Sequence, residues 1–243
     1  MLRPFDMQSG YIAYISAYCD RWCERCAFTT RCSTFAAEAA IAMCGDVGEG
    51  LELAVGLPAR VPFGPARPAQ ADGPDGFDGE GPSAADAAAC ERDEEQRRGR
   101  VDRHPVVTGA WAVSVGACQW LKAHADPLRR VADLVVGEAL AVAEHDAFLV
   151  TVKLTRAIGG RDAYARGEAR GEGPVQNDWN GSAKVALVCL ERSLEAWRVI
   201  AQASGDDAAR EIAGRMDVLR RDVEAAFPAA RAFVRPGFDE RGV

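Results

Sequence analysis

Four cysteines lie within fourteen residues near the start of the chain, and they are the side chains whose spacing most suggests chemistry. They are half of the eight cysteines in the sequence: Cys19, Cys23, Cys26 and Cys32. In a reducing compartment such a group is typical of a metal or redox site rather than of disulfides. The alternative is that the first three are small core residues on one helix face, since free cysteine buries readily. Cys32 lies beyond that face, so the pattern predicts a metal centre on all four thiols.

The identity of the metal follows from helix geometry. On a continuous helix Cys19 and Cys26 would lie ~10 Å apart along the axis, at 1.5 Å per residue. One zinc ion needs its four sulfurs within ~4 Å of one another, whereas an iron–sulfur cluster carries its ligands on separate irons and accepts a wider spread. We therefore expect one [4Fe-4S] cluster, with zinc as the alternative, and Cys44 could replace Cys19 as the fourth ligand.

The segment Cys23-Glu-Arg-Cys26-Ala-Phe-Thr-Thr-Arg-Cys32 resembles the CxxC-x₅-C segment of auxiliary four-iron clusters in peptide-modifying radical-SAM enzymes. It is also similar to the cluster segment of recombination and CRISPR-associated exonucleases, including the aromatic residue Phe28 after the second cysteine. The resemblance covers about ten residues and implies a four-iron cluster, but neither catalytic domain fits the remaining sequence. As a whole, the chain looks like uncharacterised bacterial helical proteins with an N-terminal cysteine cluster.

The cysteine spacing Cys19-x₃-Cys23-x₂-Cys26 also matches the spacing of the radical-SAM motif itself. That family places the motif on a loop after a strand, with an aromatic residue before the last cysteine. This chain has a helical pattern there and Arg25 at that position. We therefore expect an electron-transfer, redox-sensing or accessory role with a redox partner protein, and the alternative function is a zinc-stabilised helical interaction protein.

A second group of polar residues falls on a helix predicted over Pro127–Ile158. Asp146 and Lys153 lie inside its apolar arc, which is formed by Val136, Leu140, Ala143, Ala147, Val150 and Leu154. Along the edge of this arc are Glu138, His145 and Arg156. One interpretation is an ion-pair network that joins two helices, because buried charges are normally paired. The other is a polar pocket in which His145 carries a proton or binds a ligand, with Glu138 as its partner.

The remaining pattern is helical, and we expect an all-α fold. The expected parts are a cysteine-cluster helical segment over 1–57, an insertion and a charged helix over 58–104, and helices over 105–243 that pack with the N-terminal segment. Six prolines and five glycines between Pro58 and Pro82 indicate a disordered insertion. The prediction is a bundle of four or five helices with an N-terminal cysteine-cluster helix over 11–44. The β-branched pair Thr29-Thr30 is a candidate point of interruption in that helix.

The composition and hydropathy of the chain limit where the protein is expected in the cell and what it is expected to bind. The chain has 243 residues, 48% of them apolar, and a net charge of −7 without a basic stripe, so nucleic acid is a disfavoured ligand. No segment approaches the ~20 apolar residues of a membrane helix. Residues Met1–Gly10 lack the apolar core of a secretory signal. We expect a cytosolic bacterial protein without membrane contact.

The insertion provides a first test. Because loop-closure entropy changes by only ~0.6 kcal/mol per halving of length, shortening the loop should change stability little. We predict that limited proteolysis cuts first between Pro65 and Gly81, and that a deletion joining Arg60 to Ser83 folds and keeps its metal. Protection of Asp72–Gly81, or a deletion that does not fold, would indicate instead a lid over the pocket of Asp146 and Lys153.

Overall fold

The computed structural model describes residues 10–55, 83–131, 133–167 and 173–240. Within these ranges the regular elements are helices and no strand occurs, which confirms the predicted all-helical class. The chain divides into two compact units. One comprises Met1–Ser16 with Cys23–Glu95, and the other comprises Ala17–Trp22 with Gln96–Val243. The segment predicted as a disordered insertion, Pro58–Pro82, lies outside the described residues.

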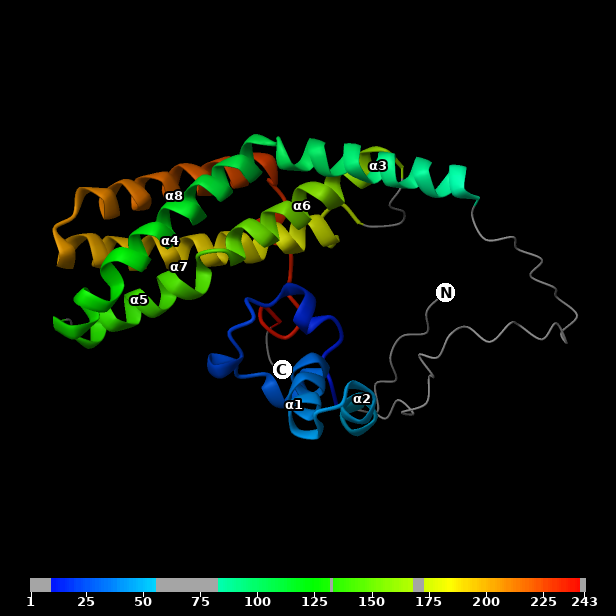
Figure 1. The fold of residues 1–243 in the computed structure, drawn as a ribbon, viewed down its shortest axis with the longest axis horizontal. Coiled ribbons are helices and arrows are strands. Elements are labelled where there is room, and N and C mark those ends of the chain that lie inside the picture. Colours follow the sequence, from blue (N-terminus) through cyan, green and yellow to red (C-terminus); the bar gives the residue numbers. More distant parts are fainter. Residues whose placement is uncertain (1–9, 56–82, 132, 168–172, 241–243) are drawn as a thin grey trace, which may run out of the picture. The chain divides into compact units, whose positions relative to one another are not determined.

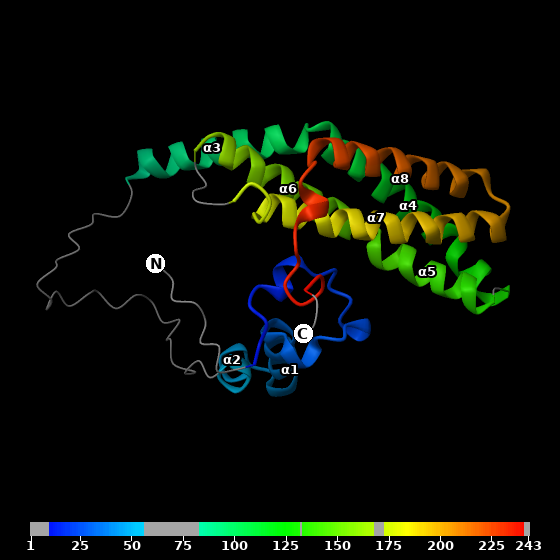
Figure 2. The same ribbon diagram turned by 180° about the vertical axis from the view of Figure 1, so that it is seen from behind.

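The larger unit is a bundle of the helices α4 to α8, which lie side by side (Figures 1 and 2). Their bounds are Pro105–Val131 for α4, Leu134–Asp146 for α5, Leu149–Ala165 for α6, Asp178–Ser204 for α7 and Asp207–Ala226 for α8. Helix α7 packs on α5, α6 and α8, and α4 closes the bundle against α8, α6 and α5. Because α7 is surrounded, its N-terminal half is buried on nearly every face.

Local sequence signals explain where α7 and α8 begin and end. The Asn177 side chain accepts a hydrogen bond from the backbone N–H of Asn180 at 2.8 Å, which caps α7. Gly205 ends α7 in the left-handed conformation, with φ of 67°. Asp206 then caps α8 and also accepts a 2.6 Å hydrogen bond from the Trp120 indole of α4. One residue therefore starts a helix and joins it to its neighbour.

The helix predicted over 127–158 is not continuous, and this changes the expected count of four or five helices. Helix α4 runs through Pro127 to Val131, since a proline near a helix end removes only one hydrogen bond. Asp133 caps α5 by accepting from the N–H of Val136, and a turn at Ala147–Phe148 separates α5 from α6. With α1, α2 and α3 included, the described residues hold more α-helices than predicted.

The predicted cysteine-cluster helix over 11–44 is wrong for most of its length. Short 3₁₀ turns occupy its first two thirds, namely η2 (Ile15–Tyr18), η3 (Cys23–Arg25) and η4 (Thr29–Arg31), and α1 begins only at Ser33 and ends at Cys44. Tyr14 and Arg21 both have φ of 61°, a left-handed conformation that stops an α-helix. The apolar spacing that suggested a helix thus belongs to a chain of turns.

Within the smaller unit, α1 packs against α2 (Val47–Val55). A Cβ atom added at Gly50 would lie 2.6 Å from the backbone of Ile41, so the two helices approach too closely for any larger residue. The Tyr11 hydroxyl donates to the Ala54 carbonyl at 3.0 Å, and the Ile12 N–H donates to the Arg31 carbonyl at 2.9 Å. These contacts fold the cysteine-containing turns back on the helix pair.

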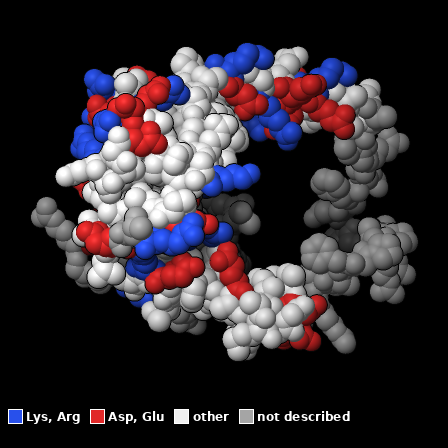
Figure 3. Space-filling view, turned by 60° about the vertical axis from the view of Figure 1, so that its left-hand side comes forward, with Lys and Arg blue, Asp and Glu red and all other residues white. Residues whose placement is uncertain are grey.

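The helix α3 (Ala84–Asp102) lies where the sequence predicts a solvated, charged helix. Basic and acidic side chains stand next to one another along it (Figure 3). Its last turns join the bundle: Val101 is buried, and Arg100 forms a 3.3 Å ion pair with Asp162 of α6. Of the described helices, none is long and apolar enough to cross a bilayer.

The core of the bundle gives a second prediction. Leu154 on α6 is fully buried, and we expect Leu154→Ala to lower the free energy of unfolding by ~2–5 kcal/mol because it leaves a cavity. Val152, two residues earlier on the same helix, is 62% exposed, so Val152→Ala should change stability by less than ~0.5 kcal/mol. Urea unfolding followed by circular dichroism measures both; equal losses would contradict this packing.

Candidate functional site

Residues Ala17–Trp22, which we call the strap, pack on three helices of the bundle. Helix α5 contacts the strap through His145, α6 through Lys153 and α7 through Arg192. The strap carries Cys19 and leads directly to Cys23. It therefore brings one predicted ligand together with most of the polar residues that the sequence singled out.

The strongest contact of this site is an ion pair between α5 and α7. Asp146 is only 2% exposed, and it accepts from Arg192 Nε at 3.0 Å, from an Arg192 terminal nitrogen at 2.5 Å and from Ser193 Oγ at 3.0 Å. The other terminal nitrogen of Arg192 donates to Asp20 of the strap at 2.6 Å. A single guanidinium thus joins a buried carboxylate to the strap, and its charge is matched by two acids.

The contact between Asp20 and Arg192 shifts the pKa of each group. Burial alone would raise the pKa of the Asp20 carboxyl. Hydrogen bonds from Arg192 and from the Trp22 N–H lower the pKa by more than burial raises it, so it lies below its ordinary value. Burial lowers the pKa of Arg192, and the hydrogen bond with Asp146 more than offsets this, so the pKa is raised. Asp20 and Arg192 therefore both stay charged at neutral pH.

His145 holds the strap through its ring and one nitrogen. Its ring stacks on the Trp22 indole, with centroids 4.3 Å apart and an interplanar angle of 12°. Nε2 lies 2.9 Å from the Asp20 carbonyl oxygen, which can only accept, so Nε2 carries the proton. The Arg192 guanidinium lies 5.0 Å from the Trp22 ring centroid in a cation–π contact. His145 thus contacts the strap through both its ring and Nε2.

Lys153 is the second buried charge. It is 7% exposed, and its ammonium group donates to the Ala17 carbonyl at 3.1 Å. Burial lowers the pKa of Lys153, while the neighbouring Cys19 acts in the opposite direction. Burial likewise raises the pKa of the Cys19 thiol, with Lys153 opposing the shift. The two groups lie close enough for the charge of each to act on the pKa of the other.

Tyr18 anchors the strap at its other end. Its hydroxyl donates to Asp178 at 3.3 Å, and Asp178 also forms a two-pronged ion pair with Arg156, at 3.0 and 2.5 Å. A Cβ atom added at Gly181 of α7 would lie 2.4 Å from the Tyr18 ring and 2.7 Å from the Phe233 ring. The glycine is therefore required for the close approach of α7 to both aromatic rings.

The polar residues predicted from the sequence divide into two groups. His145, Asp146, Lys153 and Arg156 surround the strap or its anchor Asp178, whereas Glu138 lies exposed on α5. Sequence reasoning missed the strap and the partners Asp20, Trp22, Asp178 and Arg192. The available signal was Arg192 itself, which with Glu191 and Ser193 follows the apolar run from Val185 to Leu190.

The cysteines predicted as ligands occupy turns and a helix start. Cys19 lies on the strap, Cys23 begins η3, Cys26 follows that turn, and Cys32 caps α1. Cys26 Sγ accepts from the Phe28 N–H at 3.4 Å, and Cys32 Sγ accepts from the Phe35 N–H at 3.5 Å. In the described part of the chain, no three His, Cys, Asp or Glu side chains lie close enough to share a metal ion.

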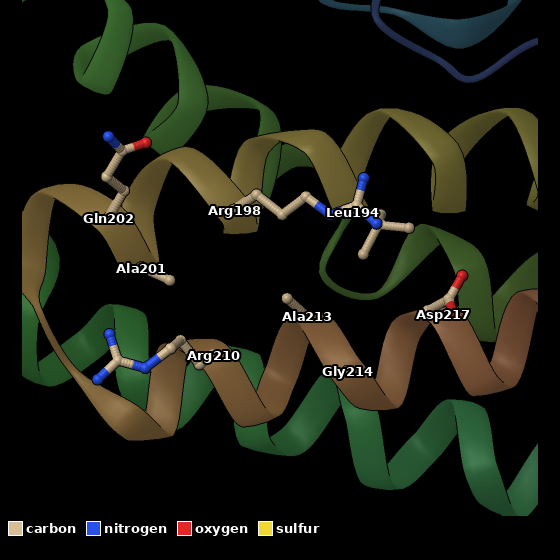
Figure 4. Close-up of a pocket in the computed structure, with 8 residues that line it drawn as sticks. All are labelled: Leu194, Arg198, Ala201, Gln202, Arg210, Ala213, Gly214 and Asp217. Atoms are coloured by element: carbon tan, nitrogen blue, oxygen red, sulfur yellow. The ribbon is translucent and has the colours of Figure 1, made fainter.

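Two surface hollows lie elsewhere on the bundle. One, of about 530 Å³, opens between α7 and α8, with Arg198 and Gln202 on one side and Arg210 and Asp217 on the other (Figure 4). Arg210 and Asp217 already form ion pairs with other residues of α8. The other, of about 430 Å³, lies between α4 and α8. Neither hollow is lined by a site residue predicted from the sequence.

The buried ion pair leads to a third prediction. We expect Asp146→Asn to lower the free energy of unfolding by ~3–5 kcal/mol, because Arg192 loses its buried counter-charge. The control is Glu144→Gln, which disrupts an ion pair between Arg129 of α4 and Glu144 of α5 whose side chains are 44% and 43% exposed. That change should cost less than ~1 kcal/mol. Equal losses in chemical denaturation would show that burial of Asp146 adds nothing.

Comparisons with other proteins add no relative from which a role could be transferred. No protein-family model matches the chain. No curated protein and no solved structure matches it either. Any functional conclusion therefore rests on the cysteine-containing turns, on the strap and on the bundle residues that hold it.

Proposed function

We propose that the chain binds one [4Fe-4S] cluster through Cys19, Cys23, Cys26 and Cys32 and has an electron-transfer or redox-sensing role with a partner protein. The observation that carries the proposal is the density of thiols, four within fourteen residues. None of the eight cysteines, all in the described part of the chain, forms a disulfide. The donor set fits a cluster, because iron–sulfur clusters are held by four cysteine thiolates.

The local conformation supports this donor set. Cys23, Cys26 and Cys32 lie on turns and at a helix start, where backbone torsions can change without unfolding a helix. Backbone N–H groups already donate to the sulfurs of Cys26 and Cys32. Hydrogen bonds of this kind to ligand sulfurs are among the factors that set the reduction potential of a cluster.

Binding must also draw the thiols together, because no three of them are grouped in the structure. The cluster would supply one-electron chemistry, and the turns of the chain would supply the ligands and exclude water. Since the ligand set is not preformed, cluster binding and the ordering of residues 19–32 should occur together. The cluster is thus expected to stabilise this segment more than the bundle.

The fourth prediction tests the centre directly. Protein purified without oxygen should be brown, should lose its broad visible absorbance on addition of dithionite, and should contain about four irons per chain. Replacement of Cys23, Cys26 or Cys32 by serine should abolish the colour and the bound iron, because each change removes a ligand.

The controls are Cys118→Ala and Cys189→Ala, on α4 and α7, which should keep the iron. Comparison of Cys19→Ser with Cys44→Ser identifies the fourth ligand. Colourless protein with one zinc per chain would replace the cluster with a structural zinc site. Retention of iron by the Cys26→Ser variant would rule out the proposed ligand set.

A further inference from the structure

Ala17, Tyr18, Asp20 and Trp22 of the strap each make a defined contact with the bundle. The contacts reach the Ala17 carbonyl, the Tyr18 hydroxyl, both the carbonyl and the carboxylate of Asp20, and the Trp22 ring. Cys19 lies between two residues whose side chains are hydrogen-bonded to the bundle, Tyr18 and Asp20. Its thiol therefore cannot leave the bundle surface unless neighbouring contacts break.

We propose that Arg192, oriented by Asp146, is a positioning residue that docks the strap and so fixes the Cys19 thiol against the bundle. The inference deepens the proposed function and rests on it in one respect, namely that Cys19 serves the cysteine centre as a ligand. Docking itself needs no metal.

The geometry of the guanidinium explains why Arg192 controls the strap. Two of its nitrogens, Nε and one terminal nitrogen, are held by the two oxygens of Asp146. Because a guanidinium is planar and rigid, this two-point contact fixes the direction of the remaining nitrogen. That nitrogen donates to Asp20 at 2.6 Å. The buried carboxylate thus directs a hydrogen bond at a residue of the strap with which it has no direct contact.

The same guanidinium makes a second contact with the strap. It lies over the Trp22 ring, whose other neighbour is the His145 ring. Arg192 therefore holds residues on the C-terminal side of Cys19 by both a charged and an aromatic contact. Since Cys23 follows Trp22 in the chain, the docked strap is also the covalent link between Cys19 and the next predicted ligand.

Docking has a chemical consequence that can be measured without metal. The thiol of Cys19 is half-buried in the docked strap, so alkylating agents should reach it slowly. A released strap would expose the thiol to water and speed the reaction. Cys118, half-buried on α4 away from the strap, reports whether the bundle itself has loosened.

The fifth prediction uses two variants that keep the net charge. Arg192→Lys retains a cation opposite Asp146 but loses the planar fork, and Trp22→Ala removes the aromatic contacts with His145 and Arg192. In reduced, metal-free protein treated with iodoacetamide, we expect Cys19 to be alkylated about tenfold faster in each variant than in the parent chain, equivalent to ~1.4 kcal/mol. Peptide mass spectrometry gives the rate for each cysteine.

The matched control is Arg129→Lys, the same substitution at the exposed ion pair with Glu144, which should leave the Cys19 rate unchanged. The proposal is overturned if Cys19 reacts within twofold of the parent rate in both variants. It is also overturned if the Cys118 rate rises in parallel, because this would indicate general loosening. If the parent chain binds no iron but Cys19 alone is alkylated faster in the two variants, the cluster is refuted and the docking is supported.

Discussion

The buried ion pair between Asp146 and Arg192 is the constraint on which the arrangement of the larger unit depends. A carboxylate at the end of α5, removed from water, must be matched by a cation with full hydrogen bonding. Arg192 meets this requirement only if α5 and α7 keep their relative height and rotation, so that both oxygens of Asp146 receive a donor. An apolar pair would pack equally well in several registers, whereas this pair specifies one.

The central position of α7 follows from the same requirement. Its N-terminal half is small and uncharged where the neighbours approach, as at Gly181, which leaves room for the Tyr18 and Phe233 rings. Arg192, farther along the helix, contacts both the strap and α5. The helix thus combines close packing at its N-terminal end with a polar junction near its middle. Together, these features seat an otherwise irregular segment on the bundle.

The helical class could be predicted from the periodicity, and the charged helix α3 from its composition. Local signals such as Gly205 and Asp206 mark helix ends in the sequence. The end of α4 and the break at Ala147 could not be predicted, since helix continuation past a proline and a two-residue turn both depend on tertiary packing. The sequence identified Asp146 and Lys153 as buried charges within an apolar arc. It could not identify their partners, because Arg192 and the Ala17 carbonyl lie 46 and 136 residues away along the chain.

The cysteine segment has the residue spacing of a helix but does not form one. Cys19, Cys23 and Cys26 have helical spacing, yet the chain there forms turns, because positive φ at Tyr14 and Arg21 interrupts any continuous helix. A straight helix would keep Cys19 and Cys26 ~10 Å apart, whereas turns can change the separation of thiols at small energetic cost. The feature that made a helix prediction fail is therefore the one that leaves the cysteines able to converge. In the proposed centre, Cys19 would stay on the strap, and the turns that carry Cys23, Cys26 and Cys32 would have to move toward it.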